Sequence, residues 1–276
     1  MRFGLDVPIS GEYADPRLLA ELAYDAEQAG WNGFFLQDGL AGGVPMIDPW
    51  IGLAAVALRT ERMRIGVFLT PLPRRRPWEV ARQATTIDRL SGGRLIFGGA
   101  LGHSEVDFTP FGDVWDARVR AERLDEALDV VTGLWGGEPY SYAGRHFRID
   151  QAQLQPTPVQ WPRIPVWLAA GWPRRRPLRR AARWDGVYLM TNNQQTNESL
   201  SIDDLAAAAR FAAQERVAAG REGPFDIAAN AMARSSDDPQ VAAFAEAGGS
   251  WWVELDIYGS ADAYRRRIRQ GPPADI

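Results

Sequence analysis

Eight short apolar runs alternate with longer amphipathic segments from one end of this chain to the other. The apolar runs have the length of β-strands and lie at residues 2–8, 33–38, 64–70, 94–101, 164–171, 186–191, 225–231 and 251–256. Segments with helical spacing follow them at roughly residues 16–30, 49–59, 78–90, 117–135, 174–184, 203–219, 238–247 and 261–269. Eight strands, each followed by a helix, predict an α/β fold of the (β/α)8 or TIM-barrel type with a parallel, buried sheet.

Residues 136–164 interrupt this alternation. The segment is long, aromatic and rich in proline, and it has no helical period, so we expect an insertion between the fourth helix and the fifth strand. The chain contains no internal repeat, linker or low-complexity run. With 276 residues and 46% hydrophobic content, residues 1–276 are predicted to form a single domain.

Composition excludes several kinds of chemistry. All 31 residues counted as lysine or arginine are arginine, cysteine is absent, and there are two histidines. Schiff-base lysines, thiolate nucleophiles, iron–sulfur ligands and three-histidine zinc sites are therefore excluded, and no metal is expected. The net charge is -4, and no basic segment is interleaved with aromatic residues, so nucleic acid is not expected as a binding partner. No signal peptide or long apolar span is present, so we expect a cytoplasmic protein without a membrane partner.

In a TIM barrel the reactive groups lie at the carboxyl ends of the strands, because the βα loops converge there. The predicted strand ends nominate a set of candidate residues: Asp6, Gln37, Asp38, residues 67–70, Gly102, His103, Ala170, Gly171, residues 191–193, Asn230, Glu254 and Asp256. His103 is the histidine at a strand end, and imidazole exchanges protons near neutral pH, so it is the candidate acid or base. His146 lies in the insertion and is predicted to be structural. For Asp38, Glu254 and Asp256, ligand orientation and pairing with arginine both remain open.

Six arginines lie between residues 174 and 183, at the start of the fifth predicted helix. A helix N-terminus attracts anions, and guanidinium groups bind phosphate in bidentate geometry. Arg174, Arg175 and Arg176 are therefore predicted to bind a phosphate or a polyanionic tail. Arg179, Arg180 and Arg183 lie beyond the first turn and are expected to pair with nearby acids on a solvated face. A second triplet, residues 74–76, follows the third strand, where a ligand role and a solvated loop remain alternatives. The doublets 203–204 and 237–238 are predicted helix caps.

Several stretches together resemble the bacterial-luciferase-like flavin monooxygenases and coenzyme F420-dependent oxidoreductases. They are LAYDAEQAGWNGFFLQD (22–38), RTERMRIGVFLTPLPRRRPWEVARQATTIDRLSGGRLIFGGALG (59–102), RAERLDEALDVVTGLWGGEPYSYAGRHFRI (120–149), PTPVQWPRIPVWLAAG (156–171) and AARWDGV (181–187). The resemblance covers roughly residues 1–190. It implies a TIM barrel that binds a reduced flavin or deazaflavin at the carboxyl ends of its strands.

Individual positions also follow from the resemblance. It implies that Asp38 lies near the isoalloxazine ring, and that Val67 and Phe68 form a bulge with a non-prolyl cis peptide behind the ring. Gly102 and His103 would line the rim of the cofactor site. The phosphate of the cofactor would be held by Ala169, Ala170 and Gly171, together with the first turn of the helix that follows them. Two departures affect the proton donor, since Gly39 replaces a histidine that many members have and Ala100 replaces a glycine.

The resemblance implies an oxidoreductase acting on a small organic substrate, with two alternatives. FMN with O2 and a separate flavin reductase would give monooxygenation, whereas F420 would give hydride transfer. A homodimer is expected, because dimers are common in the family. A flavin-binding barrel without catalysis is the main alternative. A flavin-free lyase or hydrolase using His103 is disfavoured, because the chain has neither a lysine nor a recognisable metal set.

Overall fold

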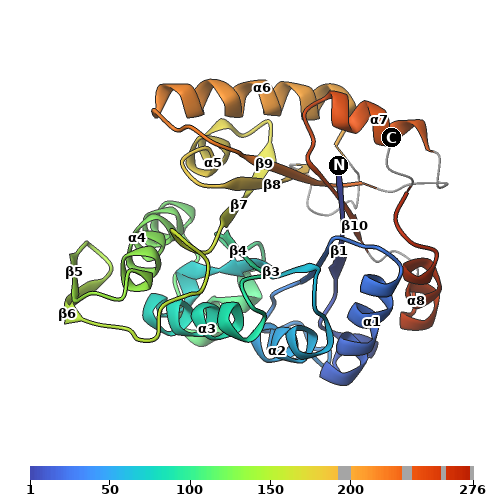
Figure 1. Ribbon diagram of the computed structural model, residues 1–276. Coiled ribbons are helices and arrows are strands. Elements are labelled where there is room, and N and C mark those ends of the chain that lie inside the picture. The colour runs from blue at the N-terminus through green and yellow to red at the C-terminus, as the bar shows by residue number, and fades with distance from the viewer. Residues whose placement is uncertain (192–199, 232–237, 256–258, 274–276) are drawn as a thin grey trace.

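The computed structural model describes residues 1–191, 200–231, 238–255 and 259–273. Within them, eight parallel strands close into a barrel in the order β1-β10-β9-β8-β7-β4-β3-β2, with β2 pairing back to β1 (Figure 1). The strands are β1 Arg2–Val7, β2 Gly33–Leu36, β3 Arg64–Pro71, β4 Leu95–Ala100, β7 Val166–Trp172, β8 Gly186–Thr191, β9 Asp226–Asn230 and β10 Trp251–Leu255. The predicted TIM barrel is confirmed, and every predicted strand is found within two residues of its expected ends.

The helices alternate with the strands as predicted. They are α1 Pro16–Gln28, α2 Pro49–Arg59, α3 Pro77–Leu90, α4 Ala117–Trp135, α5 Arg175–Ala181, α6 Ile202–Ala218, α7 Pro239–Glu246 and α8 Ala261–Arg269. Short 3-10 turns occupy η1 Gly11–Tyr13, η2 Leu72–Arg74, η3 Glu105–Asp107 and η4 Thr109–Phe111. No helix of the described residues is both long and apolar enough to cross a membrane.

Side-chain caps define where several helices begin. Asp238 caps α7 as predicted, because its carboxylate accepts the backbone N–H of Gln240. The expectation for the 203–204 doublet is wrong, since Ser201 is the cap of α6 and its hydroxyl accepts the N–H of Asp204. A hydroxyl at the true N-cap reaches the third helical N–H, whereas the two acids already lie in the first turn. Residue 237 lies outside the described residues.

Aromatic side chains fill the interior of the barrel. Phe35 and Phe68 stack with their ring centroids 3.8 Å apart, and Trp167, Tyr188 and Trp251 pack around them. Alternate residues of the same strands face outward and pack against the helices in a second, larger apolar core. Because the interior is filled, a ligand has room only at the two ends of the barrel, on either side of this aromatic layer.

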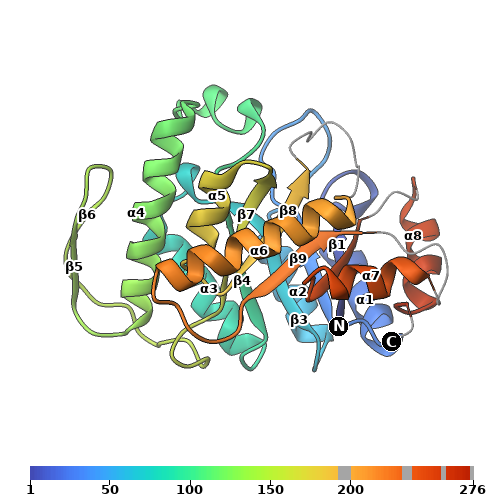
Figure 2. The ribbon, with the colours of Figure 1, turned by 90° about the horizontal axis from the view of Figure 1, so that it is seen from above.

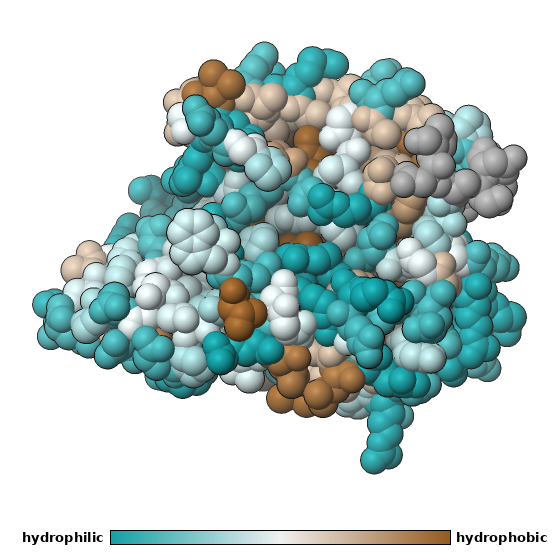
Figure 3. All heavy atoms as spheres, in the orientation of Figure 1, coloured by the Kyte–Doolittle hydropathy of each residue, from teal (hydrophilic) through white to brown (hydrophobic). Residues whose placement is uncertain are grey.

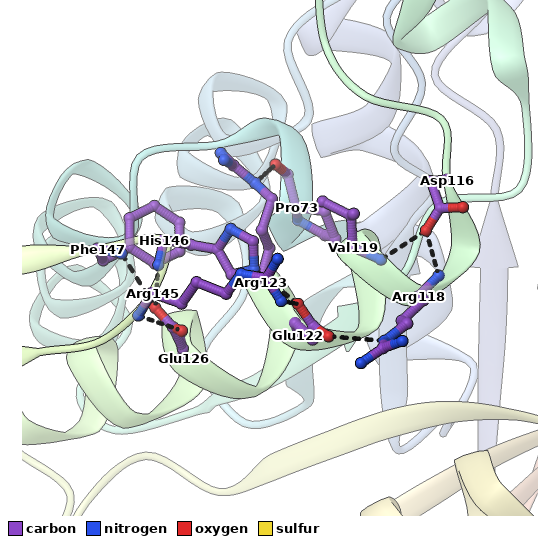
Figure 4. A network of polar contacts seen from close by, with 10 residues as sticks. All are labelled: Pro73, Asp116, Arg118, Val119, Glu122, Arg123, Glu126, Arg145, His146 and Phe147. Carbon is purple, nitrogen blue, oxygen red and sulfur yellow. Dashed lines mark hydrogen bonds and ion pairs between the residues drawn. The ribbon is translucent and has the colours of Figure 1, made fainter.

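The insertion predicted at 136–164 contains an antiparallel hairpin, β5 Tyr140–Ala143 and β6 Arg148–Ala152, which was not predicted. It lies outside α4, away from the barrel (Figure 2). Glu126 of α4 accepts the backbone N–H groups of Arg145, His146 and Phe147, and Glu122 contacts Nε2 of His146 at 3.1 Å (Figure 4). His146 thus helps to attach the hairpin to α4, in agreement with the structural role predicted for it from the sequence.

Candidate functional site

The carboxyl ends of the strands form an opening above the aromatic layer, which we call the mouth. Residues that face inward here are partly exposed, in contrast to the buried layer below: Gln37, Leu69, Ala169, Met190 and Asn230. They come from β3, β7, β8 and β9 and from the residue that follows β2. The mouth therefore combines two amides, two apolar side chains and one small residue, which suits a ligand with both polar and apolar parts.

A buried polar cluster forms the floor of the mouth. The Tyr188 hydroxyl lies 2.7 Å from Oδ2 of Asp6 and is also hydrogen-bonded to the side-chain oxygen of Asn230. Burial raises the pKa of Asp6 to about 6, while hydrogen bonds from Tyr188 and Gln37 oppose this rise. Burial and the neighbouring carboxylate also raise the pKa of Tyr188 well above its ordinary value. Oδ1 of Asp6 has no partner within hydrogen-bond distance, although Gln37 lies near enough to act on the carboxyl group.

Asp38 follows β2 at the rim, and two arginines enclose it. Its carboxylate lies 2.5 Å from Nη2 of Arg74 and 2.8 Å from Nη2 of Arg75, and its side chain is 0% exposed. Burial raises the pKa of Asp38, and the two guanidinium groups oppose this rise only in part. The sequence left two alternatives for residues 74–76, a ligand role and a solvated loop, and neither holds for Arg74 and Arg75. These two side chains are not solvated, and their guanidinium groups are already paired with Asp38 and so are not free to bind a ligand. Arg76 is exposed. Of the two alternatives left open for Asp38, the structure shows pairing with arginine.

The expected bulge lies in β3. The pairing of β3 with β4 shifts register between Val67 and Thr70, and the peptide bond between Phe68 and Leu69 is cis. The cis bond is thus found at the bulge, on the carboxyl side of Phe68. Gly98 of β4 accommodates this geometry, because a Cβ there would lie 2.5 Å from the carbonyl oxygen of Val67.

The side chains of the predicted cofactor-binding residues divide between the two faces of the barrel wall. Phe68 and Ala169 face the interior, whereas Val67 and Ala170 are buried in the outer core against the helices. Only the backbone of Val67 and Ala170 therefore remains for contact with a ligand in the mouth. Gly171 continues the inward face of β7 and is partly exposed.

Arg120 of α4 holds the loop that carries His103. Its Nη1 donates to the carbonyl oxygens of Leu101 and Gly102 at 3.2 and 2.8 Å, and its guanidinium lies 3.5 Å from the ring centroid of Trp115. Gly102 has a φ of +84°, and a Cβ there would lie 2.6 Å from the ring of Phe108, so the turn requires glycine.

His103 itself is exposed and makes no hydrogen bond to another described residue. The structure places it on the rim, as expected from its position after β4. An exposed imidazole can exchange protons with both solvent and a ligand.

A carboxylate joins two of the loops at this end of the barrel. Oδ1 of the buried Asp107 accepts the N–H groups of Leu40 and Ala41 at 3.0 and 2.8 Å. The loop after β2 is thereby fixed to the loop after β4, next to the rim position of His103. Neither Asp107 nor Arg120 was predicted from the sequence, because their partners are backbone groups of distant loops.

The six arginines after β7 separate into two groups. Arg179 pairs with Glu215 at 2.8 Å, and both Arg180 and Arg183 pair with Asp125 at 2.6 and 3.1 Å. This is the pairing with acids predicted for these three. The other three are exposed and form no ion pair with a described residue: Arg174, Arg175 and Arg176. Carboxylates lie nearby, since Glu215 acts electrostatically on Arg175 and Asp204 accepts the Nε1–H of Trp172 at the end of β7. The rim beside β7 therefore carries three exposed guanidinium groups, none of which forms an ion pair with a described residue.

Other candidates lie elsewhere. Glu254 faces the helices and binds Nη2 of Arg267 at 2.7 Å, so pairing with arginine holds for it as well. Residues 192, 193 and 256 lie outside the described residues. No group of three metal-ligating side chains comes together in the described parts of the chain.

Tyr188 was missed as a site residue. The available signal was a phenol at an inward-facing position of an otherwise apolar strand run, since side chains alternate along β8.

A pocket of about 440 Å³ opens at the opposite end of the barrel. Among its lining residues are Arg2, Arg64 and Trp251, which begin their strands. Reactive groups of TIM barrels lie at the other end, so we assign the candidate site to the mouth.

The closed barrel, the bulge in β3 and the polar mouth describe a TIM-barrel protein with a candidate binding site at the carboxyl ends of its strands. The family model for luciferase-like monooxygenases matches residues 1–271, so the chain belongs to the luciferase-like monooxygenase family. It is 31% identical over 218 residues to the F420-dependent glucose-6-phosphate dehydrogenase of Nakamurella multipartita, covering 76% of this chain and 61% of that protein. It is also 31% identical over 228 residues to the F420-dependent hydroxymycolic acid dehydrogenase of Mycobacterium tuberculosis, covering 79% and 59%. The matches thus span about three fifths of these relatives.

Solved structures share the fold. The coenzyme F420-dependent tetrahydromethanopterin reductase of Methanopyrus kandleri superposes with a TM-score of 0.80 at 16% identity, covering 98% of each chain. The oxygenating constituent of 3,6-diketocamphane monooxygenase from Pseudomonas putida, in complex with FMN, superposes with a TM-score of 0.70 at 15% identity, covering 83% of this chain and 66% of that chain. At these identities the likeness concerns the fold alone.

Proposed function

We propose that this protein is an F420-dependent oxidoreductase that interconverts a hydroxyl-bearing carbon and a carbonyl on a small organic substrate. The observation that carries the proposal is the group of three exposed arginines, Arg174, Arg175 and Arg176, which form no ion pair with a described residue and lie beside a mouth of suitable polarity. The two relatives at 31% identity support it, because both are named as F420-dependent dehydrogenases.

The residues present fit such a cofactor. Three exposed arginines suit a phosphodiester with an anionic tail, which is longer than the single phosphate of FMN. Ala169 and Gly171 leave space at the end of β7, and the amide of Gln37 would offer a donor and an acceptor to the polar part of the cofactor. The sequence-based expectation placed FMN first and F420 second, and the relatives now favour the second.

Each part of the site then has a task. When bound, the deazaflavin supplies a carbon that accepts or donates a hydride at the substrate. His103 takes the hydroxyl proton when an alcohol is oxidised and returns it when a carbonyl is reduced. The buried aromatic layer below the mouth would exclude water from that side of the site, and the three arginines would hold the cofactor by its anionic end.

We also propose that the single domain formed by residues 1–276 assembles as a homodimer through the outer face of α2. Ile51 and Leu58 lie on that face, and their side chains are 66% and 74% exposed. Figure 3 shows apolar side chains gathered where α2 reaches the surface. An exposed apolar stripe of this kind is typical of a protein interface.

Titration with F420 and with FMN, in both redox states, tests the function. We expect selective binding of F420, seen as a change in its fluorescence, followed by reduction of the bound cofactor with an alcohol from a panel of secondary alcohols. Tight FMN binding with O2-dependent reoxidation would instead support monooxygenation. Binding without turnover would favour a flavin-binding barrel, and the absence of binding to either would overturn the assignment of the arginine rim.

A further inference from the structure

The cluster on the floor of the mouth has a proton-counting problem. The hydroxyl of Tyr188 carries one proton, yet it lies between two oxygens that accept hydrogen bonds, Oδ2 of Asp6 and the side-chain oxygen of Asn230. It can donate to one of them only. The other contact is a hydrogen bond only if that neighbour donates to Tyr188 in return.

Two arrangements solve this problem. When Asp6 is protonated, its O–H donates to Tyr188, and Tyr188 donates to the carbonyl oxygen of Asn230. When Asp6 is ionised, Tyr188 donates to Asp6. The side-chain amide of Asn230 must then flip, which exchanges the positions of its oxygen and nitrogen, so that its N–H donates to Tyr188. The structure shows the first orientation, with the amide oxygen of Asn230 toward Tyr188.

The orientation of Asn230 decides what the mouth offers. Asn230 is partly exposed, and its amide nitrogen has no partner among the described residues. In the first arrangement this N–H2 group remains available to a ligand, and in the second the carbonyl oxygen takes its place. We propose that Asp6, Tyr188 and Asn230 form a proton-dependent switch that presents either a hydrogen-bond donor or an acceptor to the substrate.

The two states match the two substrates of the proposed function, on which this inference rests. A carbonyl substrate needs a donor, which Asn230 offers when Asp6 is protonated. An alcohol substrate binds with its hydroxyl donating to an acceptor, which Asn230 offers when Asp6 is ionised, and the hydroxyl turns from Asn230 to His103 before its proton is transferred. Asn230 is then the residue that contacts substrate, while Asp6 and Tyr188 are positioning residues.

Burial places the titration of Asp6 in a useful range, since its pKa rises to about 6. The groups that act on it are the neutral amide of Gln37 after β2 and the phenol of Tyr188 from β8. Tyr264 of α8, in the outer core, also acts electrostatically on Tyr188. Tyr188 remains protonated near neutral pH because its pKa is raised well above the ordinary value, so Asp6 is the group of this cluster that changes charge between pH 5 and 8.

Nuclear magnetic resonance of the protein without cofactor tests the switch. The chain has five asparagines, so selective 15N labelling gives five side-chain amide signals, and Asn230→Ala assigns the relevant one. We expect that signal to shift between pH 5 and 8 with a midpoint near 6 in the wild type. It should stay fixed in Asp6→Asn and in Tyr188→Phe. Glu254→Gln, which removes a buried carboxylate on the outer face of the barrel, should titrate as the wild type does. No shift in the wild type, or the same shift in Tyr188→Phe, would overturn the proposal.

A second experiment uses the F420-loaded enzyme with acetone and 2-propanol as probes. As pH rises through 6, we expect KM for acetone to increase and KM for 2-propanol to decrease, each by about tenfold, because one hydrogen bond is exchanged. Asp6→Asn should hold both constants near their low-pH values. Turnover in which both constants move together would leave the proposed function standing and overturn the switch. Failure to bind F420 would overturn the proposed function, and the resonance measurement would then decide the switch alone.

Discussion

The hydroxyl of Tyr188 lies 2.7 Å from Oδ2 of Asp6, although 182 residues separate the two in the chain. Asp6 is the penultimate residue of β1 and Tyr188 lies in β8, and the curvature of the closed sheet brings both side chains to the floor of the mouth. The contact joins a carboxyl group to a phenol in a place shielded from water, so both groups hold their protons more tightly than in solution.

Stability should fall as pH rises across the range in which Asp6 titrates. The folded-state pKa is about 6, above the ordinary value of 3.8, so between these values the folded protein keeps a proton that the unfolded chain has lost. The stabilising contribution is full below pH 4 and is lost as pH approaches 6, which amounts to about 3 kcal/mol. Urea unfolding of the wild type and of Asp6→Asn at several pH values measures this difference. An equal slope in the two proteins would show that Asp6 does not cause it.

Asp38→Asn should destabilise the fold by about 3 kcal/mol, because it leaves the guanidinium groups of Arg74 and Arg75 without their carboxylate. Their side chains are 4% and 15% exposed, so water compensates poorly for the loss. Denaturant unfolding is the measurement, and Arg179→Gln is the control. That substitution breaks an exposed pair and should produce no clear change. Similar behaviour of the two variants would contradict the structural importance of the Asp38 cluster.

Replacing Arg174, Arg175 and Arg176 together by glutamine should weaken F420 binding by about tenfold or more and reduce its dependence on salt. The matched control replaces the three paired arginines, Arg179, Arg180 and Arg183, which removes the same charge a short distance away. We expect the control to bind F420 nearly as the wild type does. Equal losses in the two triple variants would indicate a general effect of net charge, without a defined anion site.

His103→Gln should slow turnover by about 100-fold or more while leaving the dissociation constant of F420 within a few fold of the wild type. The physical reason is that glutamine cannot transfer a proton, although it is similar to histidine in size and can still form hydrogen bonds. Steady-state rates and a binding titration on the same preparation separate the two effects. Unchanged turnover would remove His103 from the mechanism.

A change of Ile51 and Leu58 to glutamate should convert the proposed dimer to a monomer, because it buries charge in the interface. Light scattering after size-exclusion chromatography measures the mass. Val217→Glu on α6 is the control, since Val217 is 81% exposed and lies on another face. A wild-type protein that is monomeric at high concentration would rule out this interface.

Local patterns predicted much of the architecture. Strand and helix periods depend on neighbouring residues, so β1 and α1 were placed from short windows of the chain, and Asp238 was identified as a cap in the same way. The contrast between Arg174 and Arg179 also followed from local position, because the first lies at the helix start and the second beyond the first turn. The β5–β6 hairpin was missed, because its strands alternate weakly and are held by α4.

The site required the closed barrel. Which carboxylate is paired, as Asp38 is with Arg74 and Arg75, depends on distances of a few ångströms between separate βα loops. The meeting of Asp6, Tyr188 and Asn230 depends on the register of β1, β8 and β9 around the barrel. The spacing of hydrophobic residues is a property of each segment by itself, so the sequence alone was sufficient to predict the barrel. Hydrogen bonds and charges act between segments at short range, and so only the folded barrel decides which polar groups meet and what their protons do.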